Sequence, residues 1–258
     1  MKPLQAQVQA IGFCAPGLAD WSAAQNLLAG PGDWAEQGEL HKLAPALLPA
    51  NERRRTTVLI RMALQAAQEA AGEAGGPLPA VFASSGGDLE IVDRILQALQ
   101  MPGRPVSPTH FHNSVHNAPA GYWSIARKDH APSTSVSAHD ASLATGLLEA
   151  LTWLAGGVSE VLLVAYDHPA PPTLAPFRPL LAPFAVALRL TAGGEGPGLS
   201  VQVDRGREST LDRPSLEALR QGNPAARSLP LLERLARESS GTVYLPMPAG
   251  QLRVEVAP

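Results

Sequence analysis

The amino-acid sequence predicts an α/β fold with a mainly parallel sheet and buried helices. Residues 133–167 follow the pattern of a strand, a sharp turn, a small-residue helix, a Gly-Gly break and a second strand. Residues 79–100 repeat the strand, the glycine turn and the helix. The run Val161–Ala165 is apolar throughout, which is typical of a strand covered on both faces. Repeated strand–helix–strand units need crossover connections, and these favour parallel pairing.

The N-terminal elements follow from hydrophobic periodicity. Residues 6–13 alternate between apolar and polar side chains, which predicts a half-buried strand. We expect a short helix over residues 20–28 and an irregular surface segment from there to residue 48. Asn51 is the expected cap of one long helix, because apolar residues recur after it every three or four positions, at Val58, Leu59, Met62, Ala66 and Ala70.

Two short motifs in this half allow more than one interpretation. Arg53-Arg54-Arg55 is either a basic binding patch or a solvated helix start, and solvated charge runs are the commoner case. Ser84-Ser85-Gly86-Gly87 could hold a phosphate, but it lacks the glycine spacing and the lysine of a P-loop. We therefore expect a structural turn between the strand at 79–84 and the helix at 88–100.

The second half of the chain continues with helices and strands. Residues 141–155 are apolar most of the way round a helix, which predicts a buried helix. A Pro-rich loop follows residue 167, and residues 184–190 and 199–203 are expected to form the two strands of a hairpin. Two short helices and two strands then close the chain, over residues 215–220, 229–238, 243–245 and 252–256.

These elements suggest a main domain over residues 1–203 and a small C-terminal α/β extension over residues 204–258, packed on the same domain.

The 258 residues are 45% hydrophobic and carry a formal net charge of −3, which does not favour nucleic acid or an anionic membrane surface as a partner. No apolar run approaches the ~20 residues of a membrane helix, so no membrane insertion is expected. A single cysteine, Cys14, excludes an intrachain disulfide and fits a cytoplasmic protein.

The turn at residues 138–142 is the most informative part of the sequence. It leads directly from a strand into a helix, which places its residues at the mouth of a pocket with a helix N-terminus behind them. Asp140 is expected to cap that helix, because a carboxylate accepts the free N–H groups of the first turn and meets the positive end of the helix dipole.

The run Ser135-Val136-Ser137 before this turn, with Ser142 and the helix after it, resembles the β-ketoacyl synthase pattern, in which a nucleophilic cysteine begins the helix. Asp140 stands at the position of that cysteine, with His139 and Ser142 as its neighbours. A thiolate at a helix N-terminus accepts an acyl chain, whereas a carboxylate held there is a poor acyl acceptor. The resemblance therefore implies that the scaffold is kept and that none of these three residues is catalytic.

The chain is identified as a member of the short β-ketoacyl-synthase-like N-terminal domain family, and the resemblance covers roughly Gln5 to Val203. It implies a thiolase-like half-fold without the histidines that full-length synthases contribute from a second half. Short members resemble the chain length factor of aryl polyene type II polyketide synthases. The implied function is a non-catalytic subunit, without a cofactor, that pairs with a full-length β-ketoacyl synthase in polyketide or fatty-acid-like biosynthesis. An acyl carrier protein is a further possible partner.

A segment rich in histidine and aromatic residues precedes the turn. His110, His112 and His116 invite a zinc hypothesis, but no single secondary structure satisfies both of their spacings, and no cysteine or carboxylate lies within the run, so we expect no metal. The resemblance assigns the region to a subunit interface and an acyl-pocket wall. The expected interface residues are Phe111, His112, His116, Asn117, Tyr122 and Trp123.

Two alternatives remain open at the level of sequence. Asp140, His139 and Ser142 could serve an acyltransferase or thioesterase acting on acyl thioesters, although a catalytic triad depends on geometry and not on adjacency in the chain. The chain could also be a stand-alone acyl-binding or scaffolding module.

Overall fold

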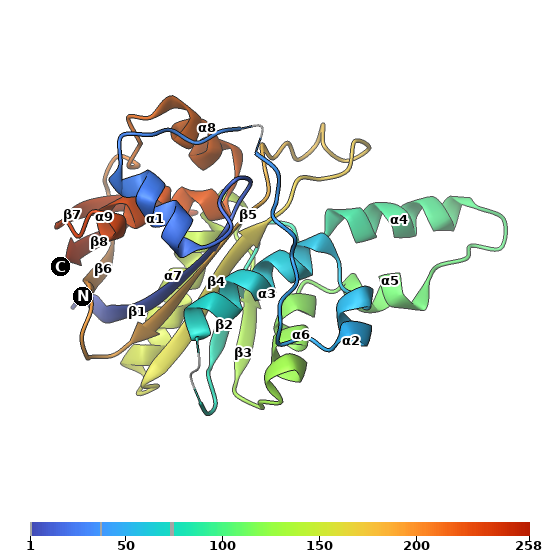
Figure 1. Cartoon of the computed structure of the whole chain (residues 1–258), viewed down its shortest axis with the longest axis horizontal. Coiled ribbons are helices and arrows are strands. Elements are labelled where there is room, and N and C mark those ends of the chain that lie inside the picture. Colours follow the sequence, from blue (N-terminus) through green and yellow to red (C-terminus); the bar gives the residue numbers. More distant parts are fainter. Residues whose placement is uncertain (1, 37, 73–74) are drawn as a thin grey trace.

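One eight-stranded sheet runs through the described part of the chain, residues 2–36, 38–72 and 75–258 of this computed structural model (Figure 1). Its strands in chain order are β1 (Leu4–Cys14), β2 (Ala80–Ala83), β3 (Ser133–Val136), β4 (Glu160–Asp167), β5 (Phe184–Thr191), β6 (Gly198–Asp204), β7 (Gly241–Pro246) and β8 (Gln251–Ala257). In space they lie in the order β3-β2-β4-β5-β1-β6-β8-β7. The apolar strand β4 therefore lies inside the sheet, as its sequence predicts.

The sheet is mixed, which corrects the expectation of a mainly parallel sheet. Strand β2 pairs in parallel with β3 and β4, and the other five pairs are antiparallel. The expected hairpin of β5 and β6 is also wrong, because β1 lies between these two strands and pairs with both. The hairpin prediction considers only neighbouring segments of the sequence. Strand β1, which is far away in the sequence, occupies the place between β5 and β6.

Helices α3 (Val58–Ala71) and α6 (Ala118–Arg127) pack on one face of the sheet. Glycine makes the contact between α3 and β1 possible: a Cβ added to Gly12 would overlap the carbonyl oxygen of Ala66 and lie 2.8 Å from its carbonyl carbon. Glu69 of α3 adds polar contacts, accepting the backbone N–H of Phe13 at 2.9 Å and of Trp21 at 2.7 Å. Helix α3 thereby fixes both β1 and the start of α1 (Trp21–Ala29).

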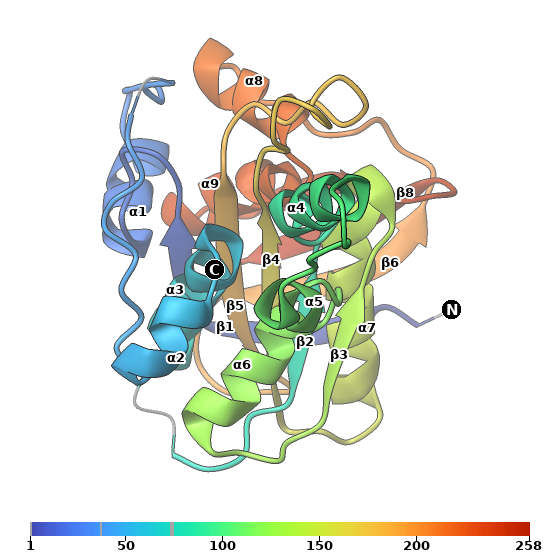
Figure 2. The same ribbon diagram turned by 90° about the vertical axis from the view of Figure 1, so that its right-hand side faces the viewer.

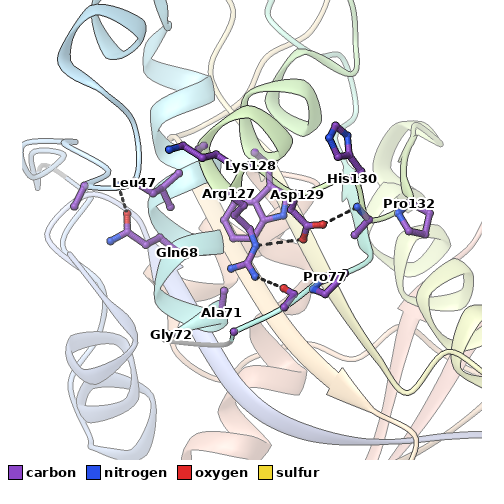
Figure 3. Close-up of a pocket in the computed structure, with 16 residues that line it drawn as sticks. Leu47, Gln68, Ala71, Gly72, Pro77, Arg127, Lys128, Asp129, His130 and Pro132 are labelled. Atoms are coloured by element: carbon purple, nitrogen blue, oxygen red, sulfur yellow. Dashed lines mark hydrogen bonds and ion pairs between the residues drawn. The ribbon is translucent and has the colours of Figure 1, made fainter.

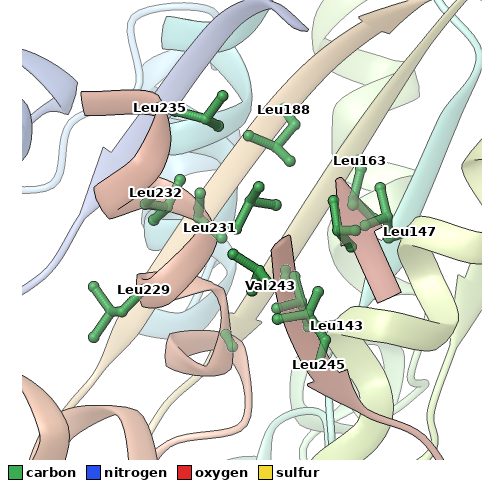
Figure 4. Packing of buried hydrophobic residues seen from close by; sticks show 14 of the residues in the cluster. Leu143, Leu147, Leu163, Leu188, Leu229, Leu231, Leu232, Leu235, Val243 and Leu245 are labelled. Atoms are coloured by element: carbon green, nitrogen blue, oxygen red, sulfur yellow. The ribbon is translucent and has the colours of Figure 1, made fainter. Parts of the chain in front are cut away.

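The other face is covered by α7 (Ser142–Ala155), α9 (Leu229–Ala236), α8 (Pro214–Gly222) and α1. Figure 4 shows leucines of α7 and α9, among them Leu147 and Leu232, directed at Leu163, Leu188 and the β7 strand. Leu147 and Leu232 are fully buried. Gly146 lets α7 approach closely, because a Cβ there would lie 2.8 Å from that of Ala83. The expected buried helix at 141–155 is thus confirmed.

The predicted long helix after Asn51 is two helices, α2 (Ala50–Arg55) and α3. The chain is extended at Thr56 and Thr57, and the Thr57 hydroxyl accepts the N–H of Ile60 at 3.3 Å, so Thr57 caps α3. Asn51 lies inside α2 and caps neither helix. The periodicity of the apolar residues continues across the break, which is why the sequence alone does not reveal it.

Helices α2, α4 (Leu89–Gln100) and α5 (Pro108–Asn113) gather at one end of the molecule, far from β6, β7 and β8 (Figure 1). Figure 2 views this end and shows α4 above α5 and α6. Within the C-terminal segment, β8 pairs with β6 and extends the main sheet. The division at residue 203 therefore falls at the end of a strand of that sheet, and it stays a prediction.

Gly12→Ala is expected to lower the free energy of unfolding by about 3 kcal/mol or more, because the new methyl group collides with the backbone of α3, which cannot yield as a side chain can. Urea unfolding followed by circular dichroism measures the change. Gly193→Ala is the matched control, since a Cβ there meets no atom within 4 Å, and it is expected to change stability by no more than about 0.5 kcal/mol. Equal stability of the two variants would contradict the close contact.

Candidate functional site

Three parallel strands end at the same edge of the sheet, and the residues that follow them form the candidate site. Ser84 and Ser85 follow β2, Asp167 ends β4, and the turn with His139 and Asp140 follows β3. Ligands of open α/β sheets commonly bind outside the carboxyl ends of parallel strands. The site therefore lies where the sequence motif at 138–142 predicts it.

The turn itself is a short 3₁₀ helix, His139–Ala141, that leads into α7. His139 has a φ of +53°, a left-handed conformation that few non-glycine residues adopt. Ser142 is buried, and its hydroxyl donates to the carbonyl oxygen of His139 at 2.7 Å and accepts the N–H of Ala138 at 3.0 Å. These bonds close the turn, so the Ser142 hydroxyl serves the backbone.

Asp140 forms ion pairs and does not cap the helix. Its Oδ1 accepts a hydrogen bond from Arg178 Nη2 at 2.8 Å, and its Oδ2 lies 3.8 Å from Arg227 Nη2. The residue before α7 is Ala141, which has no side-chain capping bond. The expected N-cap role of Asp140 is therefore wrong, because its carboxylate binds the two arginines and Ala141 occupies the N-cap position.

The charge network continues beyond the turn. Arg178 also approaches His139, with Nη1 2.9 Å from Nε2. Arg227 Nη1 lies 2.7 Å from Glu208, which in turn pairs with the buried Arg220. The hydrogen bond from Arg220 lowers the pKa of the Glu217 carboxyl to about 2. The turn is thus tied to the Pro-rich loop and to the segment beyond residue 204.

Asp167 is a site residue that the sequence analysis missed. It is almost fully buried, and its Oδ1 accepts hydrogen bonds from the Ser85 N–H at 2.8 Å, the Ser85 hydroxyl at 2.7 Å and the Ser84 hydroxyl at 3.1 Å. Its Oδ2 has no hydrogen-bond partner among the described residues. Burial raises the pKa of the Asp167 carboxyl to about 6. An acid that ends an otherwise apolar strand is the sequence signal that could have identified it.

The segment 110–123 splits between surface and core. Phe111, His112 and Asn117 are exposed, and Phe111 keeps 69% of its surface accessible. His116 lies 3.0 Å from the carbonyl oxygen of Ser84, which joins it to the candidate site. Tyr122 and Trp123 are both 3% exposed and belong to the core on the α3 side of the sheet. Their expected role as exposed interface anchors is corrected, because α6 turns both rings inward.

The exposed residues of this segment line a groove, which we call the apolar groove. It has a volume of about 590 Å³ and lies between α5 and α6. Phe111, Val115 and Ile125 line it, and each is more than half exposed. No group of three or more His, Cys, Asp or Glu residues within 2–36, 38–72 and 75–258 could hold a metal ion. His110 and His112 lie two positions apart on α5, which directs their side chains to different sides.

A cavity of about 1040 Å³ lies at the opposite end of the sheet (Figure 3). Its lining residues precede β2 and β3, whereas the candidate site follows these strands. Cys14 does not line that cavity. It is buried, and burial raises the pKa of its thiol to about 12, so the thiol stays protonated and unreactive.

The pattern of the family described as β-ketoacyl synthase, N-terminal domain, matches residues 20–246. The chain belongs to this family. Membership confirms the family that the turn at 138–142 predicts, and the α/β thiolase-like fold is confirmed with it. A comparison with curated proteins finds no significant match. No helix of the described chain is long and apolar enough to cross a membrane.

Solved structures extend the comparison. A chain of the ketosynthase (ApeO) in complex with its chain length factor (ApeC) from Xenorhabdus doucetiae is 25% identical, with a TM-score of 0.77 over 99% of this chain and 100% of that one. The ishigamide ketosynthase/chain length factor is 15% identical, with a TM-score of 0.68 over 99% of both chains. A β-ketoacyl synthase from Burkholderia phymatum is 14% identical, with a TM-score of 0.60, over 88% of this chain and 71% of that one. The last two likenesses concern the fold alone.

Titration of Asp167 is expected to make stability depend on pH. An aspartate in an unfolded chain has a pKa of ~3.9, and the folded value is about 6, so the folded chain binds more protons between these values. The free energy of unfolding of the wild type therefore falls as the pH rises from about 4 to about 6. The wild type loses about 1–3 kcal/mol of unfolding free energy over this pH range, and Asp167→Asn removes that pH dependence.

Urea unfolding at several pH values compares the two proteins. Asp212→Asn is the control, because Asp212 is exposed and has no ion pair or hydrogen bond to its carboxylate among the described residues, and it is expected to follow the wild type. Parallel stability curves of the wild type and Asp167→Asn across this window would contradict the raised pKa.

Proposed function

We propose that this chain is a non-catalytic, chain length factor-like subunit that pairs with a full-length β-ketoacyl synthase in type II polyketide biosynthesis of the aryl polyene kind, or in a related fatty-acid-like pathway. One observation carries the proposal: Asp140, in the place of the nucleophilic cysteine, is paired with Arg178 and Arg227. The likeness over nearly the full length of both chains to a ketosynthase–chain length factor complex supports it.

The chemistry of the turn argues against acyl transfer by this residue. A carboxylate stabilised by two guanidinium groups is a weak nucleophile, and attack on a thioester would require loss of both ion pairs. The product would be a reactive mixed anhydride. Asp140 therefore fits a structural role in place of a catalytic one. The proposed function needs no cofactor.

The surface supports pairing with a larger partner. The apolar groove exposes Phe111, Val115 and Ile125, and large exposed apolar surfaces are commonly closed by another protein. Strand β3 lies at the end of the strand order, so one of its edges is free among the described strands. Exposed strand edges are a second feature that partners cover. We assign the synthase to the apolar groove and place the pair in the cytoplasm, while an acyl carrier protein stays a predicted third partner.

The acyltransferase or thioesterase alternative lacks an activated nucleophile. The Ser142 hydroxyl bonds to backbone atoms, and the His139 ring is 2.9 Å from Arg178. A triad requires the imidazole to accept the serine proton, and no such contact occurs within the described residues. The stand-alone acyl-binding or scaffolding module has no observation in its favour beyond the scaffold itself.

The purified chain is expected to form no acyl-enzyme when incubated with acyl thioesters. Asp140 is held by ion pairs, the Ser142 hydroxyl is engaged with the backbone, and the Cys14 thiol is buried and protonated. Intact-protein mass spectrometry after incubation with acetyl and longer acyl thioesters is the measurement. An active full-length synthase serves as the positive control. An acyl adduct at any residue of the turn would support the enzyme alternative instead.

Phe111→Ala combined with Ile125→Ala is expected to weaken pairing with the co-expressed synthase by about tenfold or more, because both exposed side chains lose their apolar contact area. Co-purification followed by a titration in an analytical ultracentrifuge measures the affinity. Circular dichroism should show an unchanged fold, since neither side chain is buried.

Leu96→Ala with Leu99→Ala is the matched control. These two leucines of α4 are each 45% exposed and lie outside the apolar groove, so the change is expected to leave pairing intact. If the variant Phe111→Ala with Ile125→Ala pairs as the wild type does, the interface lies on another surface. A wild-type chain that ignores every co-expressed synthase would favour the binding-module alternative.

A further inference from the structure

A second groove, which we call the basic groove, lies on the other side of α5. Its volume is about 380 Å³, and it is bounded by α2, the start of α3, α4 and α5. Four arginines from three helices line it, together with a single carboxylate, Glu90. The arginines are Arg54 and Arg55 of α2, Arg61 of α3 and Arg94 of α4. The whole chain carries a net charge of −3, so this concentration of positive charge is local.

The acidic residues nearby do not neutralise the groove. Glu90 pairs with Arg94, and Glu52 lies 3.5 Å from Arg55. Arg54 and Arg61 have no ion-pair partner among the described residues, and Arg61 Nε is buried without a hydrogen bond. Two guanidinium groups are thus uncompensated in a concave site, where unpaired positive charges repel one another and favour an anion.

The groove also contains the first turn of α3, a helix of 14 residues. Thr57 and Val58 line the groove. The Thr57 hydroxyl accepts the Ile60 N–H, and the earlier amides of the first turn have no acceptor within the helix. The positive end of the helix dipole adds to the field of the arginines. The side chains of Thr109 and His110, both on α5, also line the groove.

From these contacts we infer that the basic groove is a binding site for a phosphate-bearing anion. Guanidinium groups on separate helices can each donate two parallel hydrogen bonds to one phosphoryl group, and helix N-terminal amides bind the same oxygens. A tetrahedral, multiply charged anion matches donors that converge from several directions. A protein partner with an acidic face would instead need a surface of about 800 Å² per side, far larger than this groove.

The inferred site favours the basic-patch interpretation of the Arg53–Arg55 run over a solvated helix start. Arg53 does not line the groove, whereas Arg54 and Arg55 do. The break after α2 is the structural reason, because the extended residues Thr56 and Thr57 turn α2 so that its last arginines meet the start of α3. A continuous helix would leave these arginines on a solvated surface.

The anion site is independent of the pairing proposed above. Helix α5 separates the two grooves: Thr109, His110 and Asn113 line the basic groove, while Phe111 and His112 line the apolar groove. The phosphate can belong to a free phosphate ester or to a lipid headgroup, and both present the same chemistry to the arginines. The experiment below separates the two sources.

Isothermal titration of the full-length chain with pyrophosphate at low ionic strength is expected to give saturable binding. The variant Arg54→Gln with Arg94→Gln, which changes two exposed side chains, should weaken binding by about tenfold or more, and adding Arg61→Gln should abolish it. Arg205→Gln, at an exposed arginine outside the groove, is the control and should bind as the wild type does. The pairing variant Phe111→Ala with Ile125→Ala should retain binding, so failure of the pairing proposal leaves this test unaffected.

Vesicles with and without phosphatidylglycerol form a second arm. Binding to anionic vesicles alone, lost in the same arginine variants, assigns the phosphate to a lipid. Equal pyrophosphate binding by the wild type and the triple variant would overturn the inference. So would a poly-glutamate peptide that binds the groove more tightly than pyrophosphate, because it would show that the groove selects an acidic chain.

Discussion

The close contact of two helices with opposite faces of one sheet is the constraint on which the rest of the structure depends. Helix α3 lies on β1 where Gly12 has no side chain, and α7 lies on β2 and β4 where Gly146 has none. The buried side of α3 is rich in alanine, whereas the buried side of α7 combines leucine with small residues. Because the helices sit so close, the strand ends between them are held in fixed positions, and these ends carry the candidate site.

At that edge, Asp140 forms ion pairs at the position that we assign to the nucleophile of the family. Asp140, Arg178 and Arg227 come from three segments far apart in the sequence, and their ion pairs join the turn, the Pro-rich loop and the C-terminal segment. The buried Asp167 holds the Ser84–Ser85 turn by accepting hydrogen bonds from both serines. A structural charge centre of this kind explains how the strand–turn–helix geometry persists in a chain that we assign a non-catalytic role.

The other end of the molecule carries two surfaces of opposite chemistry on either side of α5. One is apolar and suits a protein partner, and the other is basic and suits an anion. Neither is formed by a single element: Phe111 and Ile125 come from two helices, and the four arginines come from three. Their separation means that a partner can occupy the apolar groove while the basic groove keeps its own ligand.

The sequence by itself determined most of the individual elements, the family and the location of the turn, because periodicity, glycine breaks and the pattern around Asp140 are local signals. It did not determine the break between α2 and α3, because the apolar periodicity continues across it. It did not determine the mixed sheet, because β1 inserts between β5 and β6 through contacts almost two hundred residues apart. Only the tertiary structure decided that Asp140 meets arginines instead of capping α7, and that Tyr122 and Trp123 face the core. Side-chain partners of this kind depend on segments that the chain brings together only on folding.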